Sequence, residues 1–224
     1  MRLLISGLIF LSSITAVYSQ KVDVKATTDR KEVEALLKKE REKARINRAF
    51  FDEHDKCRSF LRTGEWVKAE LSCRLAVSRV EKLPKEHTLE RSSARVSLAT
   101  ALLWLQKTDE AILLLNESLE IDNATRNDSG VETGEIYFLM AQAYQVKSDV
   151  TKAAEFYNKA EATVRSAFID MGSDEGGLRV RYPKLIQNIM AGHIVLLEDN
   201  KLHERADAMR RRKTDFEKEF AKYL

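Results

Sequence analysis

The sequence has few of the residues that make tight turns. Its 224 residues include only 2 Pro and 8 Gly, whereas 33% are charged. Strong helix formers with so little punctuation are typical of an almost wholly helical protein and argue against one built from many short strands. A chain of this length fits one domain or one short repeat array, and it can bury a sizeable core.

The chain also has no excess of charge of one sign. Lys and Arg number 38 and Asp and Glu number 35, which gives a formal net charge of +3. This balance argues against an electrostatic grip on nucleic acid. Asn116, Asn123 and Asn127 each begin an Asn-x-Ser/Thr triplet, which is a glycosylation acceptor in a eukaryotic secretory pathway and has no such meaning in a bacterium.

Catalytic and metal-binding motifs are missing from the sequence. None of the histidines falls in a His-Glu-x-x-His spacing, and the two cysteines do not form a Cys-x-x-Cys pair. There is no Gly-x-Ser-x-Gly turn and no glycine-rich phosphate loop. The sequence therefore predicts a protein that is not an enzyme and that holds no metal or cofactor.

The long apolar run lies at the N-terminus. Arg2 is followed by "LLISGLIFLSSITAV" and then by the polar stretch "YSQKVD". A positive start, a short apolar segment and small residues before a polar stretch predict a secretory signal peptide over residues 1–19, with cleavage after Ser19. The alternative is an uncleaved membrane anchor, although the run is shorter than the roughly 20 residues that a spanning helix needs. We expect a periplasmic or secreted protein with no stable membrane span after cleavage.

Side chains of similar size recur every 42 residues. In one window the order large, small, large, small runs through Tyr144, Ala153, Tyr157 and Ala160. The residues 42 and 84 positions earlier keep this order: Leu102, Ala111, Leu115 and Ser118, then Phe60, Ala69, Cys73 and Ala76. A fixed period between about 20 and 50 residues in a helix-rich chain predicts a solenoid of stacked supersecondary units.

The spacing within one window predicts a helical hairpin. Ala153, Tyr157 and Ala160 share one face of a helix, and Ala141 and Tyr144 share a face of the helix before it. The polar break at Lys147–Asp149 turns the chain between them. Small residues at 141 and 153 allow the two backbones to approach closely, and an isolated hairpin of this kind needs a neighbour to cover its apolar faces.

Two segments resemble the tetratricopeptide repeat: "AYQVKSDVTKAAEFYNKAEA" and "FLRTGEWVKAELSCRLAV". Gly64 and Trp66 match the turn and the aromatic residue of that family, whereas Gln106–Lys107 and Lys147–Ser148 replace the glycine in the other units. The period of 42 is similar to that of the kinesin light chain subgroup. The resemblance implies an all-α fold, a tetratricopeptide-like α-solenoid of antiparallel helix hairpins.

A degraded fourth unit follows the three clear repeats. Leu197 and Ala206 keep the nine-residue separation of the earlier units but arrive 53 residues after their counterparts, and Arg210 replaces the large core residue. The C-terminal helices are therefore expected to cap the array. We expect a signal peptide at 1–19, a charged and partly helical segment at 20–45, and an array at 46–224 with units at about 46–82, 92–122, 134–166 and 183–224.

Cys57 and Cys73 fall at facing positions of the first hairpin, one on each helix. Two cysteines in an exported protein favour a disulfide between them. The alternative is a pair of buried free thiols that act as small apolar fillers.

The resemblance also implies a binding groove lined by the first helix of each hairpin. The side chains expected to face it are His54, Arg58, Arg62, Val96, Thr100, Trp104, Phe138, Gln142 and Gln145. Trp104 and Phe138 would be apolar anchors, and Arg58 and Arg62 would favour an acidic segment of a partner. The alternative is that Trp104 and Phe138 simply pack between units.

The favoured function is an exported, non-enzymatic scaffold that binds a protein or peptide segment in the groove. The alternative is a small-ligand receptor or an enzyme that uses the insertion at 169–181 as a lid. Self-association through an incompletely capped end is a third interpretation.

Overall fold

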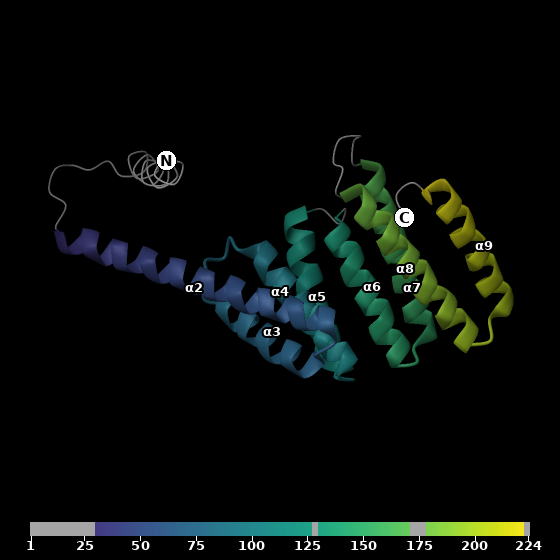
Figure 1. Ribbon diagram of the computed structural model, residues 1–224, viewed down its shortest axis with the longest axis horizontal. Coiled ribbons are helices and arrows are strands. Elements are labelled where there is room, and N and C mark those ends of the chain that lie inside the picture. The colour runs from purple at the N-terminus through teal and green to yellow at the C-terminus, as the bar shows by residue number, and fades with distance from the viewer. Residues whose placement is uncertain (1–29, 127–129, 171–177, 222–224) are drawn as a thin grey trace. The chain divides into compact units, whose positions relative to one another are not determined.

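The computed structural model describes residues 30–126, 130–170 and 178–221. Over these ranges the chain forms eight α-helices and no strand, which confirms the predicted all-α class (Figure 1). The helices are α2 (Arg30–Thr63), α3 (Trp66–Val80), α4 (Thr88–Trp104), α5 (Thr108–Arg126), α6 (Val131–Val146), α7 (Val150–Asp170), α8 (Leu178–Asp199) and α9 (His203–Glu219). The predicted signal peptide lies outside the described residues. None of the described helices is both long and apolar enough to cross a membrane.

The chain divides into two compact units, Met1–Arg45 and Ile46–Leu224. In the first unit the described part is the beginning of α2, which exposes Val33, Leu36 and Leu37. Ion pairs between neighbouring turns, such as Lys43 with Glu40 at 2.8 Å, support an exposed helix of this kind.

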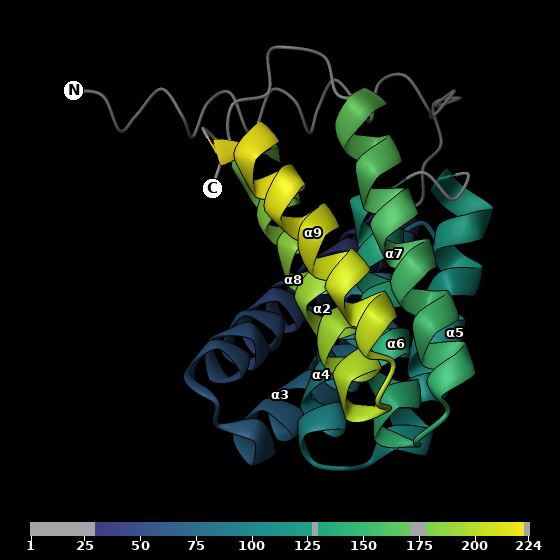
Figure 2. The same cartoon turned by 90° about the vertical axis from the view of Figure 1, so that its right-hand side faces the viewer.

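The second unit is a row of helical hairpins. After α2 and α3 come the pairs α4 with α5, α6 with α7, and α8 with α9, and each hairpin also packs against the next one in the chain. Figure 2 shows α9 as the last helix of the row, lying against α8. The predicted solenoid of antiparallel hairpins is therefore confirmed.

A left-handed residue marks the turn of every hairpin. Among the described residues, those with positive φ are Gly64, Gln106, Ser148 and Lys201, so the turns follow one another at 42, 42 and 53 residues. In each turn the next residue donates its backbone N–H to the carbonyl five residues earlier, as Glu65 does to Phe60 at 3.0 Å and Asp149 to Tyr144 at 2.9 Å. This bond satisfies a carbonyl that the end of a helix would otherwise leave unpaired. The same turn therefore forms with Gln, Ser or Lys in place of glycine.

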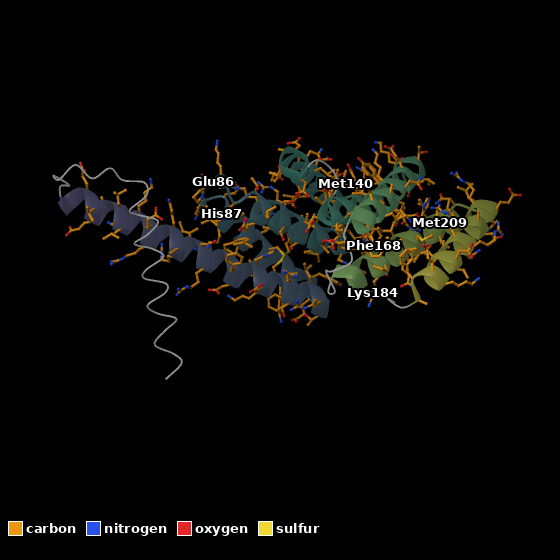
Figure 3. The ribbon with its side chains drawn as sticks, turned by 90° about the horizontal axis from the view of Figure 1, so that it is seen from above. Glu86, His87, Met140, Phe168, Lys184 and Met209 are labelled. Carbon is orange, nitrogen blue, oxygen red and sulfur yellow. A yellow bond between two sulfur atoms is a disulfide. The ribbon has the colours of Figure 1, made fainter. Side chains whose placement is uncertain are left out.

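The predicted small residues form the contact inside each hairpin. Ala69, Ala111, Ala153 and Ala206 are all completely buried, as expected for the small position of each hairpin. In the first three units the residues that follow them, Cys73, Leu115 and Tyr157, pack in apolar clusters shared between neighbouring hairpins. Met140 in the middle cluster and Met209 in the C-terminal cluster are labelled in Figure 3.

The C-terminal hairpin closes the row with a different chemistry. Arg210 is exposed at the position where the earlier units bury a large residue. Glu161 of α7 is buried and accepts hydrogen bonds from Arg165 and from Arg212 of α9, each at 2.8 Å. The Arg165 guanidinium lies 4.8 Å from the centre of the Phe216 ring. A paired buried carboxylate thus joins α7 to the last helix.

The left-handed turns predict the effect of glycine substitutions on stability. Gln106→Gly and Ser148→Gly should each raise the free energy of unfolding by about 0.5–1 kcal/mol, because glycine removes the steric penalty of a positive φ. Gly64→Ala should lower it by about 1 kcal/mol for the same reason. Chemical denaturation measures each change. Ala162→Gly at an exposed interior position of α7 is the control and should destabilise by about 1 kcal/mol. Destabilisation by both turn glycines would contradict the argument.

Candidate functional site

The first helices of the hairpins lie on the inner side of the row. The backbone of α4 approaches that of α6, and α6 likewise approaches α8. The second helices reach one another through long charged side chains, as Arg74 does with Glu110 and Arg212 with Glu161. Helices that lie closer together form the inner curve of a solenoid. The concave face is therefore made by the first helices, as the resemblance to the tetratricopeptide repeat implied.

A hollow of about 420 Å³ lies on this concave face, and we call it the central pocket. The end of α4 and the turn after it contribute Leu103, Trp104 and Gln106. The end of α6 contributes Gln142, Gln145 and Val146, and the floor and far wall come from Tyr157, Gly192 and Val195. Three of the nine residues predicted from sequence meet here, namely Trp104, Gln142 and Gln145.

Trp104 is a rigid exposed surface at the edge of the pocket. Its side chain is 62% exposed, and its ring stacks on that of Trp66 with centroids 4.6 Å apart and planes 4° from parallel. The stack fixes the orientation of the ring, so little side-chain freedom remains to be lost when a ligand binds. Phe138 differs from Trp104 because it is half-buried and packs against the Tyr157 ring at 6.1 Å, between the two helices of its own hairpin.

The pocket floor is built from two helices. Tyr157 of α7 donates a hydrogen bond of 2.7 Å from its hydroxyl to Oε1 of Gln145, and its ring stacks on His193 with centroids 5.3 Å apart. Burial raises the pKa of Tyr157 to about 12, so the hydroxyl stays a donor at neutral pH. A Cβ atom at Gly192 would lie 2.8 Å from the Tyr157 hydroxyl, so only glycine leaves room for this ring.

His54 was expected from the sequence to face the groove, but the structure buries it. It is only 6% exposed, its ring stacks on Phe50 at 5.3 Å, and its Nε2 lies 3.2 Å from Oγ of Ser97 on α4. Burial lowers the pKa of His54, and the charge of Arg58 lowers it further. The neighbouring first helix covers this side chain, which makes His54 part of the packing between units.

Charged side chains lie away from the central pocket. Arg58 and Arg62 are exposed on α2, whereas Val96 and Thr100 on α4 are half-buried. A second hollow of about 260 Å³ lies between the beginnings of α4 and α6, where Leu89 and Val96 meet Glu132 and Glu135. The concave face therefore carries an uncharged centre, with charges near the helix starts and on the first hairpin.

Cys57 and Cys73 are joined by a disulfide in this structure. Their Cα atoms are 5.0 Å apart, and both residues are completely buried between α2 and α3. Such a link restricts the unfolded chain and thereby favours the folded first hairpin. It lies in the apolar cluster behind the concave face.

Within the described ranges, no three His, Cys, Asp or Glu side chains gather in a way that could hold a metal ion. The buried polar groups described above are paired in structural contacts. What the concave face offers a ligand is aromatic and aliphatic surface together with carboxamide groups.

Comparison with known proteins identifies the repeats. A family model described as tetratricopeptide repeat matches residues 90–166, which include most of α4, all of α5 and α6, and most of α7. Residues 90–166 therefore match tetratricopeptide repeats, and the resemblance seen in the sequence is confirmed.

Two solved structures are similar to this chain, and both are from Podosopora anserina. One is described as kinesin light chain nearly identical TPR-like repeats; it is 16% identical, has a TM-score of 0.47, and the match covers 77% of this chain and 93% of that one. The other is a point-substituted form of the same repeats, with 15% identity, a TM-score of 0.48 and coverage of 76% and 95%. No curated protein matches the sequence.

The buried histidine behind the pocket predicts a pH-dependent stability. Burial lowers the pKa of His193, the Glu161 carboxylate opposes this shift, and Arg205 and Arg212 of α9 add to it. The unfolded chain, in which the pKa is about 6.5, therefore takes up the proton first as the pH falls. The contribution of His193 to stability is full above that value and is lost progressively below it.

This dependence can be measured as the change of Tm with pH. His193→Phe keeps an aromatic ring against Tyr157 and should flatten the fall in Tm between about pH 7.5 and 5.5. His203→Gln, at an exposed position on α9, is the matched control and should leave the fall unchanged. An equal fall in the wild type and in His193→Phe would show that His193 does not carry it.

Proposed function

We propose that this chain is an exported, non-enzymatic scaffold that binds a protein or peptide segment on its concave face. The observation that carries the proposal is the exposed Trp104 ring, fixed by Trp66 beside a hollow of about 420 Å³. A rigid aromatic side chain next to a pocket is the usual core of a protein-binding surface. Tetratricopeptide repeats themselves suggest a protein–protein interaction scaffold.

The charge of the first hairpin favours an acidic residue in the partner. Arg58 and Arg62 lie one turn apart on α2 and are both exposed. They are four residues apart, so they share a helix face and can meet the same acidic stretch. This contact would orient a partner without supplying most of its affinity, because exposed ion pairs contribute little.

Export is the second part of the proposal, and it rests on the N-terminal sequence. The intact mass of protein recovered from the medium or periplasm should correspond to a chain beginning at Gln20. The same sample should gain the mass of two hydrogens on reduction, because the cysteines are paired. A full-length mass in the exported fraction would exclude cleavage, and an unchanged mass on reduction would exclude the disulfide in the mature protein.

Binding on the concave face can be tested with a matched pair of variants. Trp104 and Leu113 are 62% and 58% exposed, but Leu113 lies on the second helix α5. Trp104→Ala should weaken partner binding by about ten-fold or more, as loss of an interface hot spot does. Leu113→Ala should leave it unchanged. The measurement is quantitative capture of partners from the native compartment, followed by titration of the captured partner.

Other outcomes of the same experiment separate the alternatives. If both variants lost partner binding equally, or if neither lost it, the concave face would not be the binding surface. Arg58→Glu should weaken the binding of an acidic partner more than that of a neutral one. Saturable binding of a small molecule that disappears on deletion of residues 172–177 would favour the receptor; the middle of that predicted lid, residues 171–177, lies outside the described residues.

A further inference from the structure

We propose that the central pocket is a specificity pocket for a large uncharged apolar side chain, presented by an extended uncharged stretch of the partner. The inference rests on the proposed function, because it states which part of a partner meets the middle of the concave face. It differs from the contact proposed for Arg58 and Arg62, which lie outside the pocket.

The pocket selects against charge. None of its lining residues is ionised at neutral pH: they are Trp, Tyr, Leu, Val, Gly and three Gln. A charged side chain that entered would lose part of its water and meet no opposite charge in the lining, which is unfavourable. A surface that leaves the wrong ligand unpaired in this way discriminates against it. The chemistry of the lining therefore favours an uncharged occupant.

The walls and floor are shaped before any ligand arrives. Trp104 is held by its stack on Trp66, and Val146 and Val195 are 47% and 46% exposed on facing helices. The floor is the Tyr157 ring, which reaches the pocket because Gly192 has no side chain. A preformed apolar hollow of about 420 Å³ is large enough for an aromatic or a large aliphatic side chain.

The glutamines of the pocket fit the backbone of an extended segment. A carboxamide offers both a donor and an acceptor, as a peptide group does, so Gln106 and Gln142 can pair with backbone groups of a partner irrespective of its sequence. Gln145 already uses its oxygen to accept the hydrogen bond from Tyr157. The group that Gln145 can offer a ligand is therefore its amide nitrogen, which is a donor. Backbone pairing beside one apolar hollow is the pattern expected for an extended peptide.

The test uses a phage-displayed library of random dodecapeptides as the probe, selected on the mature chain. Peptides that bind the wild type should share one large apolar residue, with neutral residues beside it. Val195→Lys places a cation in the pocket at a half-exposed position where it need not disturb folding. It should weaken the wild-type peptides by about ten-fold or more and enrich peptides with an acidic residue at the shared position.

Leu113→Lys makes the same change of charge at an exposed position on α5 and should leave the selection unchanged. The inference is overturned if wild-type peptides are acidic, require Arg58 and ignore Val195→Lys, an outcome that leaves the proposed scaffold standing. If substitutions of Trp104, Val195 and Arg58 left the binding of every selected peptide unchanged, the concave face would not be a peptide site. Both proposals would then be wrong.

Discussion

The close approach of two helices at a small residue determines the rest of this structure. Ala69, Ala111, Ala153 and Ala206 have no exposed surface, as expected for small residues that face the partner helix of each hairpin. A larger residue there would force the backbones apart, and packed interiors resist such a change. Since the contact is alike in each unit, each hairpin presents similar apolar faces to its neighbours. Stacking then brings all first helices to one side, which creates the concave face.

The sequence predicted the hairpins well because they depend on side-chain bulk at fixed spacing. Gln106 and Ser148 fall at the turn by their distance from Gly64, although neither is glycine. The groove was predicted less completely, since helix phase shows where a side chain leaves its helix but not what covers it. The neighbouring helix covers His54, and Gly192 follows an insertion that shifts the period. The pocket depends on such contacts between units.

Charged side chains hold the register between units and add little to stability. Lys107, in the second turn, pairs with Glu70 of the previous unit at 2.7 Å, and Lys147, in the third turn, pairs with Asp109 at 2.5 Å. The hydrogen bond from Lys107 lowers the pKa of Glu70. Exposed pairs of this kind typically contribute at most about 1 kcal/mol. Both pairs join a hairpin turn to the preceding unit, where they oppose sliding of one hairpin past the next.

Tyr157 shows how a binding surface can be added to a repeat without disturbing it. At this position the first unit has Cys73 and the second Leu115, and both are buried and too short to reach past the first helices. The tyrosine fills the same core position with its ring, and its hydroxyl continues to Gln145 on the concave face. It can do so because Gly192 on α8, the first helix of the next hairpin, has no side chain that would collide with the hydroxyl. One longer core residue and one glycine thus form the floor of a preformed hollow between two stacked hairpins.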